Sequence, residues 1–124
     1  MNTPGQDPSP DWPRPVVHWA IIARDPERQR AFYSALFGWA IGDGPIMDVP
    51  AGYGGPEPGP AGHIQQGETP GVVLYVQVRD LAASVAAAVE HGGTVTFERF
   101  DVPGGPTLAG IVDPEGNPVT LVQQ

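Results

Sequence analysis

Residues 16–38, VVHWAIIARDPERQRAFYSALFG, decide the fold of this chain. The stretch begins with a run rich in Val and Ile that is polar only at His18, which predicts a strand. Asp25 is then predicted to cap a helix that has Pro26 at its first position. Gly38 supplies the left-handed conformation that commonly ends a helix. We therefore expect a buried strand, a sharp corner and a helix closed by glycine.

A second stretch with the same design begins about half a chain later, at residues 72–93, VVLYVQVRDLAASVAAAVEHGG. Aligning Asp25 with Asp80 brings the two Arg-Asp corners together and places His18 opposite Val73. We therefore interpret the two stretches as copies of an internal repeat. The informative difference between the two copies is a histidine in one strand and a valine in the other.

The two faces of the repeated strand are predicted to have different roles, because successive side chains of a strand point to opposite sides. One face of the second copy is wholly apolar and should pack on a helix; it consists of Leu74, Val76 and Val78. The other face carries polar atoms and should line a concavity; it consists of Val73, Tyr75 and Gln77. By the repeat, His18, Ala20 and Ile22 line the same concavity, whereas Trp19 and Ile21 belong to the core.

Apolar residues at helical spacing predict which face of each helix meets the sheet. In the first helix these residues are Ala31, Phe32, Ala35 and Leu36. In the second helix they are Leu81, Val85, Ala88 and Val89. Further extended runs are predicted at Trp39–Ile41, Ile46–Val49, His63–Gln66, Thr94–Val102, Thr107–Val112 and Val119–Gln123. Strand alternation in 94–102 places Val95, Phe97 and Arg99 on one face, and the Gly/Pro-rich residues 50–62 are expected to form a loop.

Composition narrows the classes of function. The chain has 124 residues, no Cys and a net charge of −8 with no Lys. The absence of Cys excludes disulfides and thiolate metal sites, and the acidic balance argues against binding a phosphate backbone. No apolar run approaches the roughly 20 residues of a membrane span. We expect a cytoplasmic protein with no nucleic-acid or membrane partner.

The segments HWAIIARDPERQRAFYSALFGW (18–39) and DPEGNPVTLVQ (113–123) resemble the vicinal oxygen chelate superfamily, which includes glyoxalase I, extradiol dioxygenases and bleomycin-resistance proteins. The resemblance implies an α+β fold of two β-α-β-β-β modules, residues 16–66 and 72–124, forming a curled half-barrel around a pocket. The proline-rich residues 1–15 are expected to be a flexible tail. Members of this superfamily often dimerise, so a homodimer is expected.

Metal-dependent members of this superfamily take ligands from the first and last strands of each module. By resemblance, His18 and His63 fall on the ligand positions of the first module, whereas Val73 and Thr120 occupy those of the second. A catalytic metal usually has three protein ligands, and neither Asp48 nor Glu98 lies where the resemblance places one. We therefore expect no cofactor, with a divalent Zn, Ni, Fe or Mn ion on His18 and His63 as the alternative.

The predicted function is the binding of a small organic molecule between the modules, with sequestration of a toxic or antibiotic compound as one form. Tyr75 and Gln77 are the foremost contact candidates, because they offer an aromatic surface and an amide. The remaining candidate ligand contacts are His18, His63, Tyr53, Phe97, Arg99 and Thr120. The enzyme alternative is a metal-dependent lyase, isomerase or dioxygenase. A purely structural or regulatory domain is the third possibility.

Overall fold

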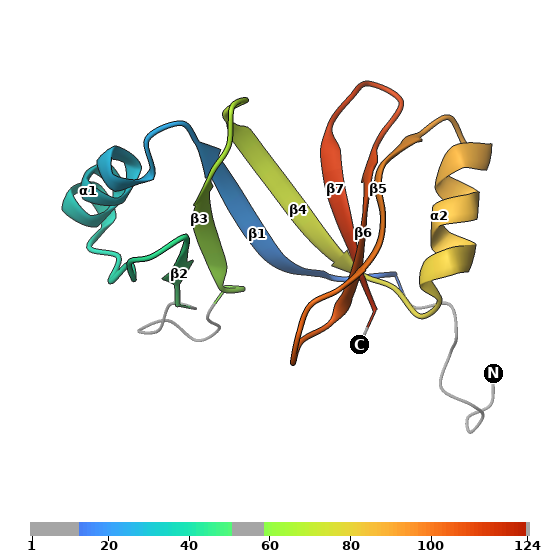
Figure 1. The fold of residues 1–124 in the computed structure, drawn as a ribbon, viewed down its shortest axis with the longest axis horizontal. Coiled ribbons are helices and arrows are strands. Elements are labelled where there is room, and N and C mark those ends of the chain that lie inside the picture. Colours follow the sequence, from blue (N-terminus) through green and yellow to red (C-terminus); the bar gives the residue numbers. More distant parts are fainter. Residues whose placement is uncertain (1–12, 51–58, 124) are drawn as a thin grey trace.

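A single mixed sheet with a helix near each end forms the body of the molecule (Figure 1). The computed structural model describes residues 13–50 and 59–123. The elements in these residues are β1 (Val16–Ala23), α1 (Pro26–Phe37), β2 (Ile46–Val49), β3 (Gly62–Gln66), β4 (Gly71–Gln77), α2 (Leu81–Glu90), β5 (Thr94–Asp101), β6 (Thr107–Val112) and β7 (Pro118–Gln123). The predicted α+β class is confirmed. Neither helix is long and apolar enough to cross a membrane.

The strand order is β2-β3-β1-β4-β7-β6-β5, with the two predicted opening strands side by side at the centre. β1 and β4 are antiparallel, and each of them pairs in parallel with the last strand of its own half, β3 or β7. The edge strands β2 and β5 are not paired with each other, so the sheet is open. The curled half-barrel stays a prediction.

Both helices begin at the predicted caps. The carboxylate of Asp25 accepts a hydrogen bond from the backbone nitrogen of Arg28 at 3.2 Å, and Asp80 accepts one from Ala83 at 3.0 Å. Gly38 has φ +71° and ends α1 in the left-handed conformation. These contacts satisfy backbone groups that each helix end leaves without an internal partner.

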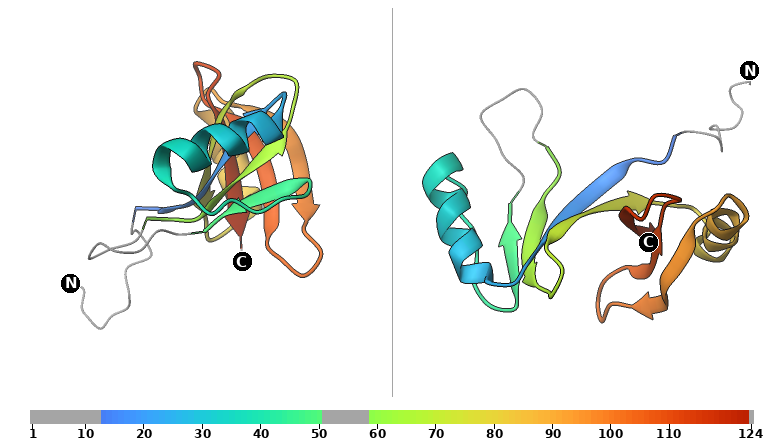
Figure 2. Two further views of the ribbon diagram at one scale, coloured as in Figure 1. Left: turned by 90° about the vertical axis from the view of Figure 1, so that its left-hand side faces the viewer. Right: turned by 90° about the horizontal axis from the view of Figure 1, so that it is seen from above.

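The core consists of two separate clusters, one beneath each helix, and the helices lie at opposite ends of the sheet (Figures 1 and 2). The cluster beneath α1 contains Ala23, Ile41, Met47, Val49 and Ile64, with Trp19, Ile21, Tyr33 and Trp39 packed against it. The cluster beneath α2 contains Val78, Leu81, Ala109 and Leu121, with Val85, Ile111 and Val119 packed against it. The predicted core positions of Trp19 and Ile21 are confirmed.

The predicted apolar stripe of α1 is wrong. All four of its residues are exposed, Phe32 by 55% and Leu36 by 58%. Tyr33 faces the core instead, because its ring stacks on Trp39 with the centroids 5.3 Å apart. In α2 the prediction holds for Leu81 and Val85, whereas Val89 is 53% exposed.

The middle of the helix-bearing sheet face is uncovered. Leu74 was expected to pack on a helix but is 45% exposed, and Val72 on the same face is 59% exposed. The reason is the spread of the helices to opposite ends of the sheet, which leaves the β1–β4 junction open between them (Figure 1). Only Val78, at the end of the predicted apolar face, is buried in a core cluster.

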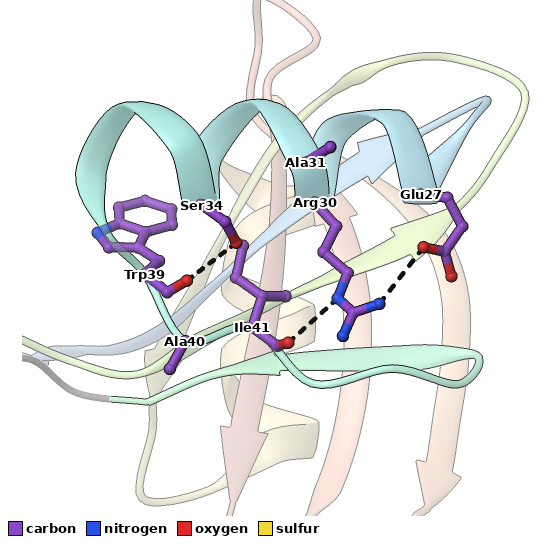
Figure 3. Close-up of a pocket in the computed structure, with 7 residues that line it drawn as sticks. All are labelled: Glu27, Arg30, Ala31, Ser34, Trp39, Ala40 and Ile41. Carbon is purple, nitrogen blue, oxygen red and sulfur yellow. Dashed lines mark hydrogen bonds and ion pairs between the residues drawn. The ribbon is translucent and has the colours of Figure 1, made fainter.

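The predicted extended run Trp39–Ile41 forms no strand, so residues 16–66 contain three strands among the described residues. Side chains of α1 bind the backbone of this run instead (Figure 3). Ser34 Oγ donates to the carbonyl of Trp39 at 2.9 Å, and Arg30 Nε donates to the carbonyl of Ile41 at 3.1 Å. The carbonyl oxygens of Trp39 and Ile41 thus bind side chains of α1.

Candidate ligand-binding cavity

A cavity of about 780 Å³ lies on the sheet face opposite the core clusters. Strand alternation places it there, because His63 and Gln65 flank the buried Ile64 and point to the other side. The lining residues are Val17, His18, Ile46, His63, Gln65, Tyr75, Phe97, Phe100, Val102, Pro103, Pro106, Leu108, Thr120 and Val122. They come from strands in both halves of the sheet and from the loop between β5 and β6. The volume is within the range of cavities that hold small organic ligands.

A chain of hydrogen bonds joins three polar side chains of this cavity. His18 Nε2 lies 2.8 Å from His63 Nδ1, and His63 Nε2 lies 2.6 Å from Gln65 Oε1. The two imidazole rings stack with their centroids 5.0 Å apart. Burial and the proximity of His63 lower the pKa of His18, and the carboxylate of Asp48 opposes this shift. His18 is thus biased toward its neutral form.

Tyr75 and Thr120 form a second polar pair on β4 and β7. The two residues are register partners and share a side-chain hydrogen bond. Burial raises the pKa of Tyr75, so its phenol stays protonated near neutral pH. The Tyr75 ring also meets His18 edge-on with the centroids 5.0 Å apart. The polar side chains of β1 and β3 are therefore in contact with those of β4 and β7 through His18 and Tyr75.

Phenylalanines of β5 form part of the apolar wall, in an arrangement that strict alternation does not produce. Phe97 lies opposite Gly110 and Phe100 lies opposite Leu108, so an irregularity puts an extra residue in β5 between them. This extra residue brings Phe100 to the cavity beside Phe97. The prediction that Arg99 shares a face with Phe97 is wrong, because Arg99 lies in a separate pocket beside α2.

The structure brings together five of the eight predicted contact residues: His18, His63, Tyr75, Phe97 and Thr120. Gln77 does not line the cavity; its backbone nitrogen binds the carbonyl of Pro15 at the end of β4. Ala20 was expected to line the cavity but is fully buried. Tyr53 lies outside the described residues.

Gln65 was not predicted, although alternation with His63 along the same strand is a signal that points to it. Phe100 was also missed. Its place depends on the irregular pairing of β5 with β6, which no local pattern of the sequence reveals.

The polar residues of the cavity do not fit a three-ligand metal centre. Both ring nitrogens of His63 are engaged, one by His18 and one by Gln65. A metal ion bound through His63 Nδ1 requires the His18–His63 hydrogen bond to break, since a ligating nitrogen must offer its lone pair, whereas the bond from His63 Nε2 to Gln65 can persist. Among residues 13–50 and 59–123 no group of three or more His, Asp or Glu side chains is placed to hold a metal ion.

Comparison with known proteins identifies the family. A family model described as the glyoxalase-like domain matches residues 17–122. The chain belongs to the glyoxalase-like domain family. The vicinal oxygen chelate resemblance expected from the sequence is thereby confirmed.

Relatives of this glyoxalase-like protein agree with that assignment. A putative glyoxylase of Mycobacterium bovis is 32% identical over 112 residues, which cover 80% of this chain and 41% of the relative. The chain thus spans about two fifths of the length of this curated relative.

Two solved structures share the fold. A glyoxalase/bleomycin resistance protein/dioxygenase superfamily member from Vibrio splendidus aligns with a TM-score of 0.64 and 15% identity, covering 90% of this chain and 100% of the other. Streptomyces coelicolor methylmalonyl-CoA epimerase, in complex with 2-nitronate-propionyl-CoA, aligns with a TM-score of 0.56 and 17% identity, covering 89% and 94%. At these identities the likeness concerns the fold alone.

Proposed function

We propose that this glyoxalase-like protein binds a small, uncharged organic molecule in the cavity, and that it does so without a metal ion. Sequestration of a toxic or antibiotic compound is the form of this function that we favour. The epimerase structure with a bound coenzyme A ester supports the general idea that this fold holds organic ligands. The ligand of the present chain is a proposal drawn from its own cavity.

The observation that carries the proposal is the composition of the cavity lining. Histidine, glutamine, tyrosine and threonine supply hydrogen-bonding groups, and Phe97, Phe100 and Leu108 supply apolar surface. No Asp, Glu, Arg or Lys lines the cavity among the described residues. Such a lining favours a neutral ligand with one flat apolar part, since aromatic surface with a few polar groups is typical of small-molecule sites. The net charge of −8 alone would instead suit a basic ligand.

A thermal-shift screen of small aromatic compounds in the presence of EDTA tests the proposal. We expect binders that raise the melting temperature of the wild type and lose this effect in Phe100→Ala. Phe32→Ala is the matched control, because Phe32 and Phe100 are 55% and 54% exposed and only Phe100 lines the cavity. Stabilisation that requires added Zn, Ni, Fe or Mn and disappears in His18→Ala would contradict the proposal and favour the metal-dependent lyase, isomerase or dioxygenase.

The homodimer expected from the superfamily is also a proposal. It is supported by the apolar side chains on the outside of α1, where Phe32, Leu36 and Phe37 are each more than half exposed. Contiguous apolar surface of this kind marks interaction sites in many proteins. The assembly state in solution is the test, which we describe with the other predictions.

A further inference from the structure

The hydrogen-bond chain of the cavity has a direction. Gln65 Oε1 accepts hydrogen bonds only, so His63 Nε2, 2.6 Å away, carries the proton of that bond. A neutral imidazole has one donor and one acceptor nitrogen. His63 Nδ1 is therefore an acceptor, and His18 Nε2, 2.8 Å from it, is the donor.

The series of hydrogen bonds from Gln65 to His18 leaves one lone pair, on His18 Nδ1, without a hydrogen bond among the described residues. With its proton on Nε2, the neutral His18 ring carries an unprotonated Nδ1. In the part of the chain that the structure describes, no hydrogen bond to His18 Nδ1 is found, while His18 itself lines the cavity. The His18 ring thus has one acceptor nitrogen that remains for a ligand.

We propose that His18 Nδ1 selects a ligand that carries an N–H or O–H donor beside a flat apolar group, and that Gln65 is the positioning residue that sets this preference. The ligand class is an uncharged aromatic compound with an O–H or N–H donor, such as a phenol or an indole. This inference rests on the proposed binding function and adds the direction of the hydrogen bond. Gln65 acts through His63 and does not itself need to touch the ligand.

The first test reads the histidine tautomers in the free protein, so it needs no ligand. Long-range ¹H–¹⁵N spectra at about pH 8 distinguish Nε2–H from Nδ1–H rings, because imidazole is then largely neutral. We expect both His18 and His63 to be Nε2–H tautomers. We expect Gln65→Leu to abolish the single Nε2–H form of His63, and Gln66→Leu to preserve it, because Gln66 is exposed and bonds to Glu68 instead. A His18 ring protonated on Nδ1 would overturn the inference.

The second test compares donor probes with their methylated counterparts, phenol with anisole and indole with 1-methylindole. One neutral hydrogen bond corresponds to roughly five- to tenfold in affinity. We therefore expect phenol and indole to bind about five- to tenfold more tightly than the methylated compounds in NMR titrations. In Gln65→Leu the difference should fall below about twofold, and in Gln66→Leu it should persist.

The outcomes separate this inference from the proposed function. Methylated probes that bind the wild type as tightly as their parents would overturn the donor preference while leaving small-molecule binding intact. If none of the four probes binds, the donor preference is overturned. The thermal-shift screen described above still tests the proposed binding function. The tautomers of the free protein still decide whether Gln65 orients the two histidines.

Discussion

The ring of Phe97 occupies the space that a side chain at Gly110 would need. A Cβ atom at Gly110 would lie 2.3 Å from two carbons of that ring, which is closer than real contacts allow. The two residues are also register partners in the β5–β6 ladder, at the centre of its irregular pairing. The apolar wall of the cavity therefore depends on a glycine of the neighbouring strand.

Gly110→Ala should displace Phe97 and destabilise the protein. We expect a loss of about 1–3 kcal/mol, the usual cost of forcing extra volume into a packed site. Urea denaturation measures this change. Gly71→Ala is the control, since a Cβ on that strand glycine would meet no atom within 4 Å. An equal effect of the two substitutions would show that Phe97 does not pack on Gly110.

Ile64→Ala should be among the most destabilising core substitutions, because Ile64 is fully buried beneath α1. Removing such a side chain leaves a cavity and costs about 2–5 kcal/mol. Ile46→Ala, at a position that is 48% exposed, should cost less than about 1 kcal/mol. Chemical denaturation of both variants compares them, and similar losses would contradict the difference in burial between the two positions.

Stability should decrease as the pH falls through the usual histidine range. The pKa of His18 is lowered in the folded state, so the unfolded chain binds more protons in the window between that lowered pKa and the ordinary value. The free energy of unfolding therefore rises with pH across this window and is level above it. His63 and Asp48 act on His18 with opposite signs.

Urea titrations between pH 5 and 8 measure this slope, with the pH range chosen from the ordinary histidine pKa. We expect His18→Gln to flatten it. His91→Gln should retain the slope, because His91 lies at the end of α2 away from the cavity. A slope that is unchanged in His18→Gln would assign the pH dependence to other groups.

The double variant Phe32→Glu/Leu36→Glu should convert the expected dimer into a monomer, because it places two carboxylates in the exposed apolar face of α1. Sedimentation velocity measures the change, and circular dichroism should show the helix retained. Val89→Glu, on the exposed side of α2, serves as the control and should remain dimeric. A wild type that sediments as a monomer would contradict the homodimer.

Local patterns predicted both helix caps and the two opening strands, as well as the core position of Trp19. Each of these follows from residues close in the chain: a carboxylate bonding to a backbone nitrogen three residues on, or an alternation of period two. Among the predicted contacts that line the cavity, His18 and Tyr75 follow from strand alternation, whereas His63 and Thr120 were implied by the resemblance to the vicinal oxygen chelate superfamily.

Local sequence patterns did not predict which face of α1 packs on the core. The predicted stripe has helical spacing, but the face of α1 that meets the core depends on the stacking of Tyr33 on Trp39. It also depends on the bonds that Ser34 and Arg30 make to the backbone of residues 39–41 (Figure 3). The same hydrogen bonds hold residues 39–41, which form no strand. These are packing interactions that override periodicity.

By itself, the sequence determined where both helices begin and the side of the sheet on which His18 and Tyr75 lie, because these depend on helix capping and strand alternation. The α+β class was implied by the resemblance to the vicinal oxygen chelate superfamily. Only the tertiary structure decided that Phe100 rather than Arg99 joins Phe97, because the irregular pairing with β6 changes which side chains share a face. It also decided that His18 of β1 bonds to His63 of β3. The physical reason is that hydrogen bonds between strands require a register, which is established only when the sheet is assembled.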